Sequence, residues 1–222
     1  MMTETSPLIA IDGPAASGKG TLSRALAEKL NFAHMDTGAL YRAVAYEVLR
    51  AGADPSDEGD ALKGVERLTQ APVLSDALDN PALRGEEIGE AASKVAAMGE
   101  VRKRLVALQR GFAQNPPEGF AGAVLDGRDI GTVICPDAAL KLFITADPEV
   151  RALRRFKELQ LRGVKGTYEA VLADMNARDA RDTQRETAPL KPAPDAFVID
   201  TSRMNESQAL EKALEQVRAK GF

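Results

Sequence analysis

The sequence predicts an α/β fold, a parallel sheet of about five strands with helices on both faces. Short apolar runs, the length of buried parallel strands, alternate along the chain with longer segments. In those longer segments the apolar residues recur every three or four positions, which is the period of amphipathic helices. Hydrophobic residues make up 44% of the 222 residues, enough for a sizeable core, so general disorder is excluded.

The predicted elements follow one another in a regular order. Four apolar runs are expected to be buried strands, and residues 32–35 form a weaker fifth candidate; the four are residues 8–11, 123–125, 140–144 and 197–199. A helix follows the first strand, and a second follows residues 32–35, with Thr37 as its expected N-cap and an end near Gly52. Their apolar stripes, with that of a C-terminal helix, are Leu22, Leu26 and Leu30, then Leu40, Val44 and Val48, and finally Leu210, Leu214 and Val217.

Two segments interrupt this alternation. Residues 72–114 begin with loop-like residues at Pro72 and then show a helical pattern from about residue 86 to 112. Residues 147–190 show two helical patterns separated near Gly163–Gly166. We therefore expect one domain, residues 1–222, with a core of residues 1–71, 115–146 and 191–222.

Charge and cysteine content limit the class of protein. The net charge of −4 and the pI near 5.3 argue against a protein that binds nucleic acid or a membrane surface. Residues 151–185 nevertheless hold nine basic and five acidic residues, which indicates a local phosphate clamp. Cys135 is the only cysteine, which favours a reducing compartment. With no leader pattern and no 18-residue apolar run, we expect a cytoplasmic protein.

The turn after the first strand carries the most informative motif, Gly13-x-x-x-x-Gly18-Lys19. Between a strand and a helix this spacing is typical of a phosphate-binding P-loop. Glycine lets the backbone approach an anion closely, and the loop N–H groups and the helix N-terminus then point at the phosphates. Lys19 adds a mobile charge that can follow the transferred group. The sequence therefore predicts binding of a nucleoside triphosphate.

The end of this loop, GKGT, narrows the prediction. Most P-loops place Ser or Thr directly after the lysine, where its hydroxyl binds Mg²⁺. Here Gly20 stands in that position and a hydroxyl arrives only at Thr21, which becomes the candidate metal contact. The string resembles the loop of nucleoside monophosphate kinases more than that of GTPase switches or helicases.

Polar residues that follow the other strands are further candidates, because ligands bind at the carboxyl ends of a parallel sheet. Asp126, Arg128 and Asp129 follow the strand at 123–125, although an Asp/Arg pair that only caps the turn is an alternative. Arg42, in the helix after residues 32–35, could hold an anion or be solvated.

The basic stretch offers two more groups of candidates. Arg151, Arg154 and Arg155 have helical spacing and could meet a polyphosphate or form a solvated helix face. A second group shares one helix face by spacing and could equally be a ladder of salt bridges; its members are Arg178, Asp182 and Arg185.

These segments, in this order, resemble bacterial cytidylate kinases over nearly the whole chain. The resemblance consists of IDGPAASGKGT, MDTGALYR, AASKVA, LDGRDIGT, the arginine-rich segment and ARDARDTQRETAPL. It implies a P-loop core, a nucleoside monophosphate (NMP)-binding insertion at about residues 72–114 and an ATP lid with its following helix at about 147–190. It also implies transfer of the γ-phosphoryl group of ATP to CMP or dCMP, with Mg²⁺, by a monomer.

The resemblance assigns roles to individual residues. The loop that holds ATP comprises Gly13, Pro14, Ala15, Ala16, Ser17, Gly18, Lys19, Gly20 and Thr21, and the lid contributes Arg151, Arg154 and Arg155. Lys19, Arg128, Arg154, Arg155 and Arg185 are the catalytic candidates. CMP is expected to meet Asp36, Thr37, Tyr41, Arg42, Ser93, Arg110, Asp126, Arg128, Asp129, Arg178, Asp182 and Arg185. Among these, Arg42, Arg128 and Arg185 resemble a clamp on its phosphate, and Ser93, Arg110 and Asp129 resemble readers of cytosine.

The sequence departs from the family in its insertion, and three alternative functions are considered. The segment VLSDALDNPALRGEEIG is short and lacks alternation, so the small sheet of the insertion is expected to be reduced or missing. A kinase for another monophosphate or a small hydroxyl substrate is the nearest rival. A GTPase switch lacks its guanine-reading string here, and a nucleic-acid-dependent ATPase conflicts with the acidic charge and few aromatic residues.

Overall fold

A computed structural model describes residues 6–70 and 77–221. The chain forms two compact units. The first unit comprises the described residues up to Met35 and those from Phe112 onward, and the second comprises the described part of Asp36–Gly111.

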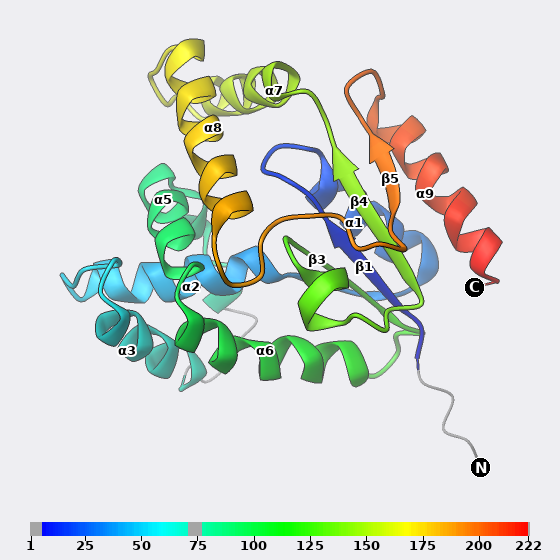
Figure 1. The fold of residues 1–222 in the computed structure, drawn as a ribbon, viewed down its shortest axis with the longest axis horizontal. Helices are drawn as coiled ribbons and strands as arrows, with labels where there is room; N and C mark the ends of the chain where they lie inside the picture. The colour runs from blue at the N-terminus through cyan, green and yellow to red at the C-terminus, as the bar shows by residue number, and fades with distance from the viewer. Residues whose placement is uncertain (1–5, 71–76, 222) are drawn as a thin grey trace. The chain divides into compact units, whose positions relative to one another are not determined.

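The first unit is built on a five-stranded sheet, which confirms the predicted α/β class (Figure 1). The strands are β1 (Leu8–Asp12), β2 (Ala33–Asp36), β3 (Ala123–Gly127), β4 (Leu140–Thr145) and β5 (Phe197–Asp200), in the order β2-β3-β1-β4-β5. β1 pairs in parallel with both β3 and β4, and β4 pairs in parallel with β5. The register sets Asp12 beside Gly127, so the loops that follow β1 and β3 leave the sheet at neighbouring points.

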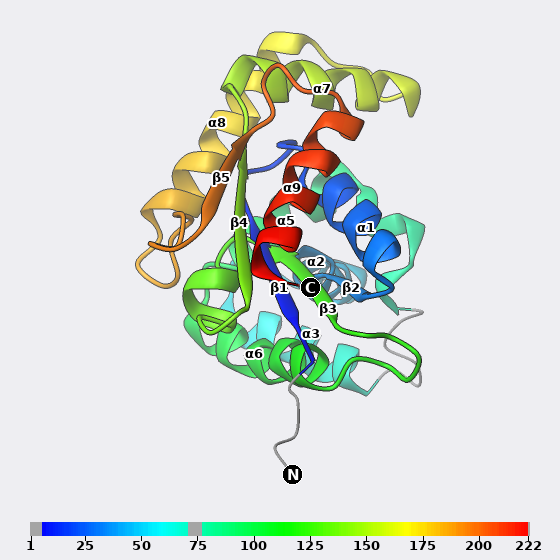
Figure 2. The ribbon, with the colours of Figure 1, turned by 90° about the vertical axis from the view of Figure 1, so that its right-hand side faces the viewer.

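One face of this sheet is covered by α1 (Lys19–Leu30) and α9 (Glu206–Lys220), which lie side by side (Figure 2). Each buries one apolar stripe against alternate strand residues, and this alternation is why a parallel sheet needs a covering helix. The core cluster includes Ile9, Ile11, Leu22, Leu26, Val124, Leu142, Ile144, Ala213 and Val217. A capping box formed by Asn205 and Gln208 begins α9.

Strand β5 departs from the expectation that all the apolar runs are buried. It lies at the edge of the sheet, and Phe197 and Val198 are 38% and 50% exposed. Only Ile199 points into the core. An edge strand has a neighbour on one side only, which the apolar run by itself does not reveal.

The basic stretch forms two helices, as predicted, α7 (Pro148–Leu161) and α8 (Tyr168–Gln184). They pack against each other through Ala152, Leu159, Val171 and Met175. The chain turns between them at Gly163, which has a φ of 72°.

The second unit is helical: α2 (Thr37–Arg50), α3 (Glu58–Thr69), the 3₁₀ turn η1 (Pro81–Arg84), α5 (Glu86–Val95) and most of α6 (Gly99–Gln114). The predicted stripe of α2 is fully buried at Leu40, Val44 and Val48. Gly64 of α3 brings the two helices close, since a Cβ there would lie 2.8 Å from a methyl group of Val48.

The segment expected to be the insertion, residues 72–114, differs from the prediction in its helices. The helix expected from about residue 86 to 112 is two helices, because Ala97 and Met98 donate to carbonyls three residues back and close the first helix with a tight turn. Residues 77–111 hold no strand, in line with a reduced small sheet. The expected loop start at Pro72 lies outside the described residues.

None of the helices in the described ranges has the length and apolar character needed to cross a lipid bilayer.

Candidate active site

The P-loop runs from Gly13 to Gly18 and has the backbone geometry that its glycines were predicted to allow. A Cβ at Gly13 would lie 2.0 Å from the carbonyl oxygen of Ile144, so no larger residue fits. Gly18 has a φ of 87°, in the left-handed region. Ala16 also has a positive φ, of 55°, which costs an alanine on the order of 1 kcal/mol and is typical of a functional loop.

Several carbonyl groups of this loop are held by side chains and helix bonds. Thr201 Oγ1 donates to the Ser17 carbonyl at 2.9 Å, and an Nη1 hydrogen of Arg151 donates to the Ala15 carbonyl at 3.3 Å. Helix α1 has Gly18 as its N-cap, and no side chain within the described ranges caps it. The first N–H groups of α1 are therefore available to an anion.

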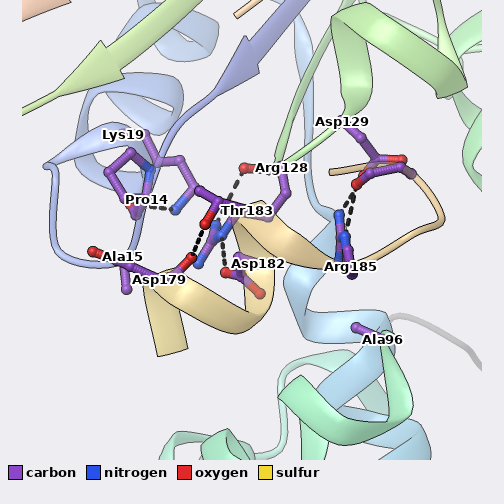
Figure 3. Close-up of polar contacts among 12 residues, drawn as sticks. Pro14, Ala15, Lys19, Ala96, Arg128, Asp129, Asp179, Asp182, Thr183 and Arg185 are labelled. Atoms are coloured by element: carbon purple, nitrogen blue, oxygen red, sulfur yellow. Dashed lines mark hydrogen bonds and ion pairs between the residues drawn. The ribbon is translucent and has the colours of Figure 1, made fainter. Parts of the chain in front are cut away.

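The loop residues fit a triphosphate and its metal. The Ser17 hydroxyl is buried and has no hydrogen-bond partner among the described residues. It could therefore donate a hydrogen bond to a phosphate bound at the loop. Lys19 Nζ donates a long hydrogen bond, of 3.4 Å, to the Pro14 carbonyl of the loop (Figure 3). Thr21 is exposed in the first turn of α1, where its hydroxyl could meet a metal bound to phosphates.

Asp12, the last residue of β1, anchors the loop that follows β3. Its two carboxylate oxygens accept hydrogen bonds from the backbone N–H groups of Ile130 and Gly131, each at 2.8 Å. Burial raises the pKa of Asp12 to about 6, although these two bonds act in the opposite direction. The position of Arg128 and Asp129 is thus tied to the strand that precedes the P-loop.

Arg128 pairs with Asp182 of α8, with Nε 2.9 Å from Oδ2 (Figure 3). Burial alone would raise the pKa of Asp182, but Arg128, Arg178 and Arg185 together hold it below its ordinary value. Arg128 therefore forms its ion pair with Asp182 of α8. This is a concentration of cationic groups at the carboxyl end of β3.

Arg185 lies 3.6 Å from Asp129, between Nη2 and Oδ1, and its Nε donates to the Ala188 carbonyl at 2.7 Å (Figure 3). The expectation that Arg185 shares a helix face with Arg178 and Asp182 is wrong in one respect. Helix α8 ends at Gln184, and Arg185 is its C-cap with an extended ψ of 140°. The helical period no longer applies to it, so its direction is set by the following turn.

Asp126, at the end of β3, is paired with the only histidine of the chain. His34 Nε2 lies 2.7 Å from Asp126 Oδ2, and the aspartate side chain is 3% exposed. Spacing did not predict this pair, because the two residues lie 92 positions apart and meet only through the neighbouring strands β2 and β3.

The three arginines predicted for the lid lie in α7 but differ in their surroundings. Arg151 is buried between the P-loop and α8, 2.7 Å from Asp179. Arg154 donates to the hydroxyl and carbonyl of Thr201 at 3.0 and 2.6 Å. Arg155 is paired with Glu158 one turn further on.

In the second unit the start of α2 differs from the prediction. The N-cap is Asp36, whose Oδ1 accepts from the Ala39 N–H at 3.3 Å, and Thr37 is the first helical residue. Asp36 also pairs with Arg42 at 2.5 Å. Two adjacent residues of the capping type left the choice open, and an acid in this position both caps the helix and pairs with the arginine.

Two of the three residues predicted to contact cytosine, Ser93 and Arg110, lie in the second unit. Ser93 is buried in α5, whereas Arg110 is exposed in α6. Sequence reasoning missed Arg102 of the same helix, which is 3% exposed, donates to the Ala96 carbonyl at 3.2 Å and lies 5.7 Å above the ring of Tyr41. The one available signal was its place beside the apolar stripe of α6, and many solvated arginines share it.

Comparisons with known proteins agree with this geometry. The family described as cytidylate kinase matches residues 9–219. A cytidylate kinase of Rhodospirillum rubrum is 55% identical over 94% of this chain and 95% of its own length. The chain belongs to the cytidylate kinase family.

A second relative supports the family, and a solved structure supports the fold. A cytidylate kinase of Paramagnetospirillum magneticum is 54% identical over 94% of this chain and 96% of its own. The crystal structure of an uncharacterized protein from Eubacterium ventriosum matches with a TM-score of 0.53 at 18% identity, covering 96% of this chain and 99% of that one. This last likeness concerns the fold alone.

Proposed function

We propose that this kinase transfers the γ-phosphoryl group of ATP to CMP or dCMP, giving ADP and CDP or dCDP. The observation that carries the proposal is a P-loop whose Ser17 and Ala15 carbonyl groups accept hydrogen bonds from the side chains of Thr201 and Arg151. The chain that contains it matches the cytidylate kinase family over residues 9–219. ATP is the donor that this loop suits, because its N–H groups and Lys19 can cradle the β- and γ-phosphates.

The reaction requires no general base. A phosphate oxygen of CMP is already anionic and attacks the γ-phosphorus of ATP, while the bond from that phosphorus to the β,γ-bridging oxygen breaks and ADP leaves. Lys19, Arg128 and Arg185 are the groups that we propose to neutralise the charge spread over the equatorial oxygens. From the lid, Arg154 and Arg155 contribute to the same charge balance after exchanging their present partners.

Mg²⁺ would be held chiefly by the triphosphate, with Thr21 as the candidate protein contact. When bound, it would supply charge neutralisation between the β- and γ-oxygens. The protein's own contribution at this point is to orient the first turn of α1, through the Gly18 N-cap and the hydrogen bond from Thr201 to the Ser17 carbonyl.

The acceptor phosphate is the proposed partner of Arg128 and Arg185, with Arg42 as a further arginine. Each of the three is already paired with a carboxylate, Asp182, Asp129 and Asp36 respectively. Such pairs hold a guanidinium in place before the substrate arrives, and a dianionic phosphate can join or replace the carboxylate. Arg178 and Asp182 are proposed to contact the ribose or the phosphate region.

Cytosine recognition is proposed to use a carboxylate and a guanidinium. Asp129 can accept from the N4 amino group, as acids do with cytosine in DNA grooves. Ser93 and an arginine can donate to N3 and O2. Arg110 is the arginine expected for this role, and Arg102, which lies over the ring of Tyr41, is a second candidate. Uracil would set a carbonyl oxygen against the carboxylate, a mismatch on the order of a few kcal/mol.

A coupled assay of ADP release across CMP, dCMP, UMP, AMP and GMP tests the proposal, with the diphosphate product identified by mass spectrometry. We expect the highest kcat/KM for CMP and dCMP. Asp129→Asn should narrow the preference for CMP over UMP, while leaving the KM for ATP within about twofold. A higher kcat/KM for AMP, GMP or UMP than for both cytidine nucleotides would refute the proposed substrate.

We further propose that the kinase acts as a monomer in the cytoplasm. The single cysteine, which is buried, supports a reducing compartment. Analytical ultracentrifugation at micromolar concentration tests the monomer directly.

A further inference from the structure

Arg151 is a buried arginine that joins three parts of the first unit. Its Nε donates to the Ala146 carbonyl at the end of the β4 segment, at 2.9 Å. Its Nη1 lies 3.3 Å from the Ala15 carbonyl of the P-loop and 2.7 Å from Asp179 Oδ2 of α8. The side chain is only 5% exposed, so these contacts take place away from bulk solvent.

Packing supports the same connection independently of the charges. The methyl groups of Ala15 and Ala16 pack against the apolar cluster between α7 and α8, which contains Ala152, Val171 and Met175. The P-loop and the helix pair therefore share both a polar contact and an apolar one. A shift of the loop has to be accommodated by α8, since packed interiors leave little free space.

Helix α8 in turn carries groups proposed for the acceptor nucleotide. Asp182 lies one turn beyond Asp179 and pairs with Arg128 at the end of β3, and Arg185 follows the helix end. Arg151 thus contacts the Ala15 carbonyl and Asp179, one turn of α8 separates Asp179 from Asp182, and Asp182 pairs with Arg128. The Asp179 Oδ1 atom is buried without a hydrogen-bond partner among the described residues, and Arg151 pairs with the other oxygen of this carboxylate, Oδ2.

We propose that Arg151 is a positioning residue that couples the P-loop to helix α8, so that a triphosphate in the loop strengthens binding of CMP. This inference rests on the proposed function. Arg151 then acts through Ala15 and Asp179 and does not need to touch either nucleotide. By linkage, CMP must strengthen binding of the triphosphate by the same factor.

Arg151→Lys and Asp179→Asn test the coupling, because each keeps the approximate size of the side chain. The Kd of CMP is measured by calorimetry with and without saturating β,γ-methylene ATP, and the ratio of the two values is the coupling factor. We expect a factor of at least roughly fivefold in the unaltered kinase and close to one in both variants. In Asp179→Asn the Kd of CMP alone should change by less than about twofold.

Asp174→Asn is the matched control, since it makes the same chemical change at an exposed position of α8. It should leave the coupling factor unaltered. Circular dichroism and the Tm show whether each variant remains folded, and Asp179→Asn gives a second measurement if Arg151→Lys does not.

The outcomes separate this inference from the proposed function. CMP that neither binds nor turns over would refute the function. Normal turnover with an unaltered coupling factor in Asp179→Asn, or a factor of one in the unaltered kinase, would refute the coupling alone. Loss of triphosphate affinity in Arg151→Lys, with Asp179→Asn unaffected, would show instead that Arg151 binds the nucleotide directly.

Discussion

Lys19 opens helix α1 and carries the charge that the proposed reaction needs most. Its hydrogen bond to the Pro14 carbonyl is long, 3.4 Å, so this bond contributes little to the stability of the loop. Its role is better measured by rate than by stability.

Lys19→Met should therefore lower kcat for CMP phosphorylation by roughly a hundredfold to a thousandfold, the effect of removing one preorganised charge donor from a transition state. The Tm should remain within a few degrees. Steady-state kinetics and thermal denaturation of the same preparation measure both. A variant with near-normal kcat would remove Lys19 from the catalytic groups.

Asp12 shows how burial alters a single carboxyl group. Its pKa is raised to about 6 from the ordinary 3.8, so between these values the folded protein binds the proton and the unfolded chain does not. The free energy of unfolding contributed by this group is therefore largest below pH 4 and is lost as the pH rises toward 6.

Comparison with Asp12→Asn isolates this effect. The difference in unfolding free energy, unaltered kinase minus variant, should decrease by about 2 kcal/mol between pH 4 and pH 7. Urea denaturation across that range measures it, and the other carboxyl groups cancel because both proteins contain them. A difference that is constant or increases with pH would contradict the raised pKa.

At the scale of elements, helix α2 depends on one acid at its start. Asp36 both caps the helix and pairs with Arg42, and the two roles can be separated. Asparagine keeps an oxygen that can accept the capping hydrogen bond but loses the charge, whereas alanine loses both.

Asp36→Ala should lower the free energy of unfolding by about 1 kcal/mol, and Asp36→Asn by clearly less. Thr37→Ala is the comparison that distinguishes the observed cap from the one expected from sequence. If Thr37→Ala proved the more costly of the two alanine variants, the assignment of Asp36 as the cap would be wrong. Chemical denaturation monitored by circular dichroism gives all three values.

At the scale of the whole molecule, the chain leaves one unit for another and returns. The unit with the P-loop is discontinuous, interrupted by Asp36–Gly111. A ligand bound at the loop is expected to stabilise the unit that carries it.

A non-hydrolysable ATP analogue at a hundred times its Kd should raise the unfolding free energy of this unit by about 2.7 kcal/mol. Gly13→Ala should abolish the increase, because the added Cβ would lie 2.0 Å from the Ile144 carbonyl. Gly111→Ala is the control, since a Cβ there meets nothing within 4 Å. Denaturation with and without the analogue decides, and a preserved increase in Gly13→Ala would show that the loop tolerates a side chain.

Local sequence determined much of this protein. The five strands, the P-loop and the division between α7 and α8 follow from apolar period and motif spacing, because these record which backbone a short segment can adopt. The family was indicated by the resemblance of the motif strings. Polar residues at the ends of β1 and β3 could be gathered into one site in advance, since parallel strands end at the same edge.

Only the tertiary structure decided the partners of those residues. Asp126 meets His34, Arg128 meets Asp182 and Arg151 joins Ala15 to Asp179, across separations of 28 to 136 positions. The exposed edge of β5, the break before α6 and the burial of Arg102 belong to the same class. A charged side chain can be solvated or paired at almost equal free energy on a local segment, and what removes it from water is the packing of distant elements.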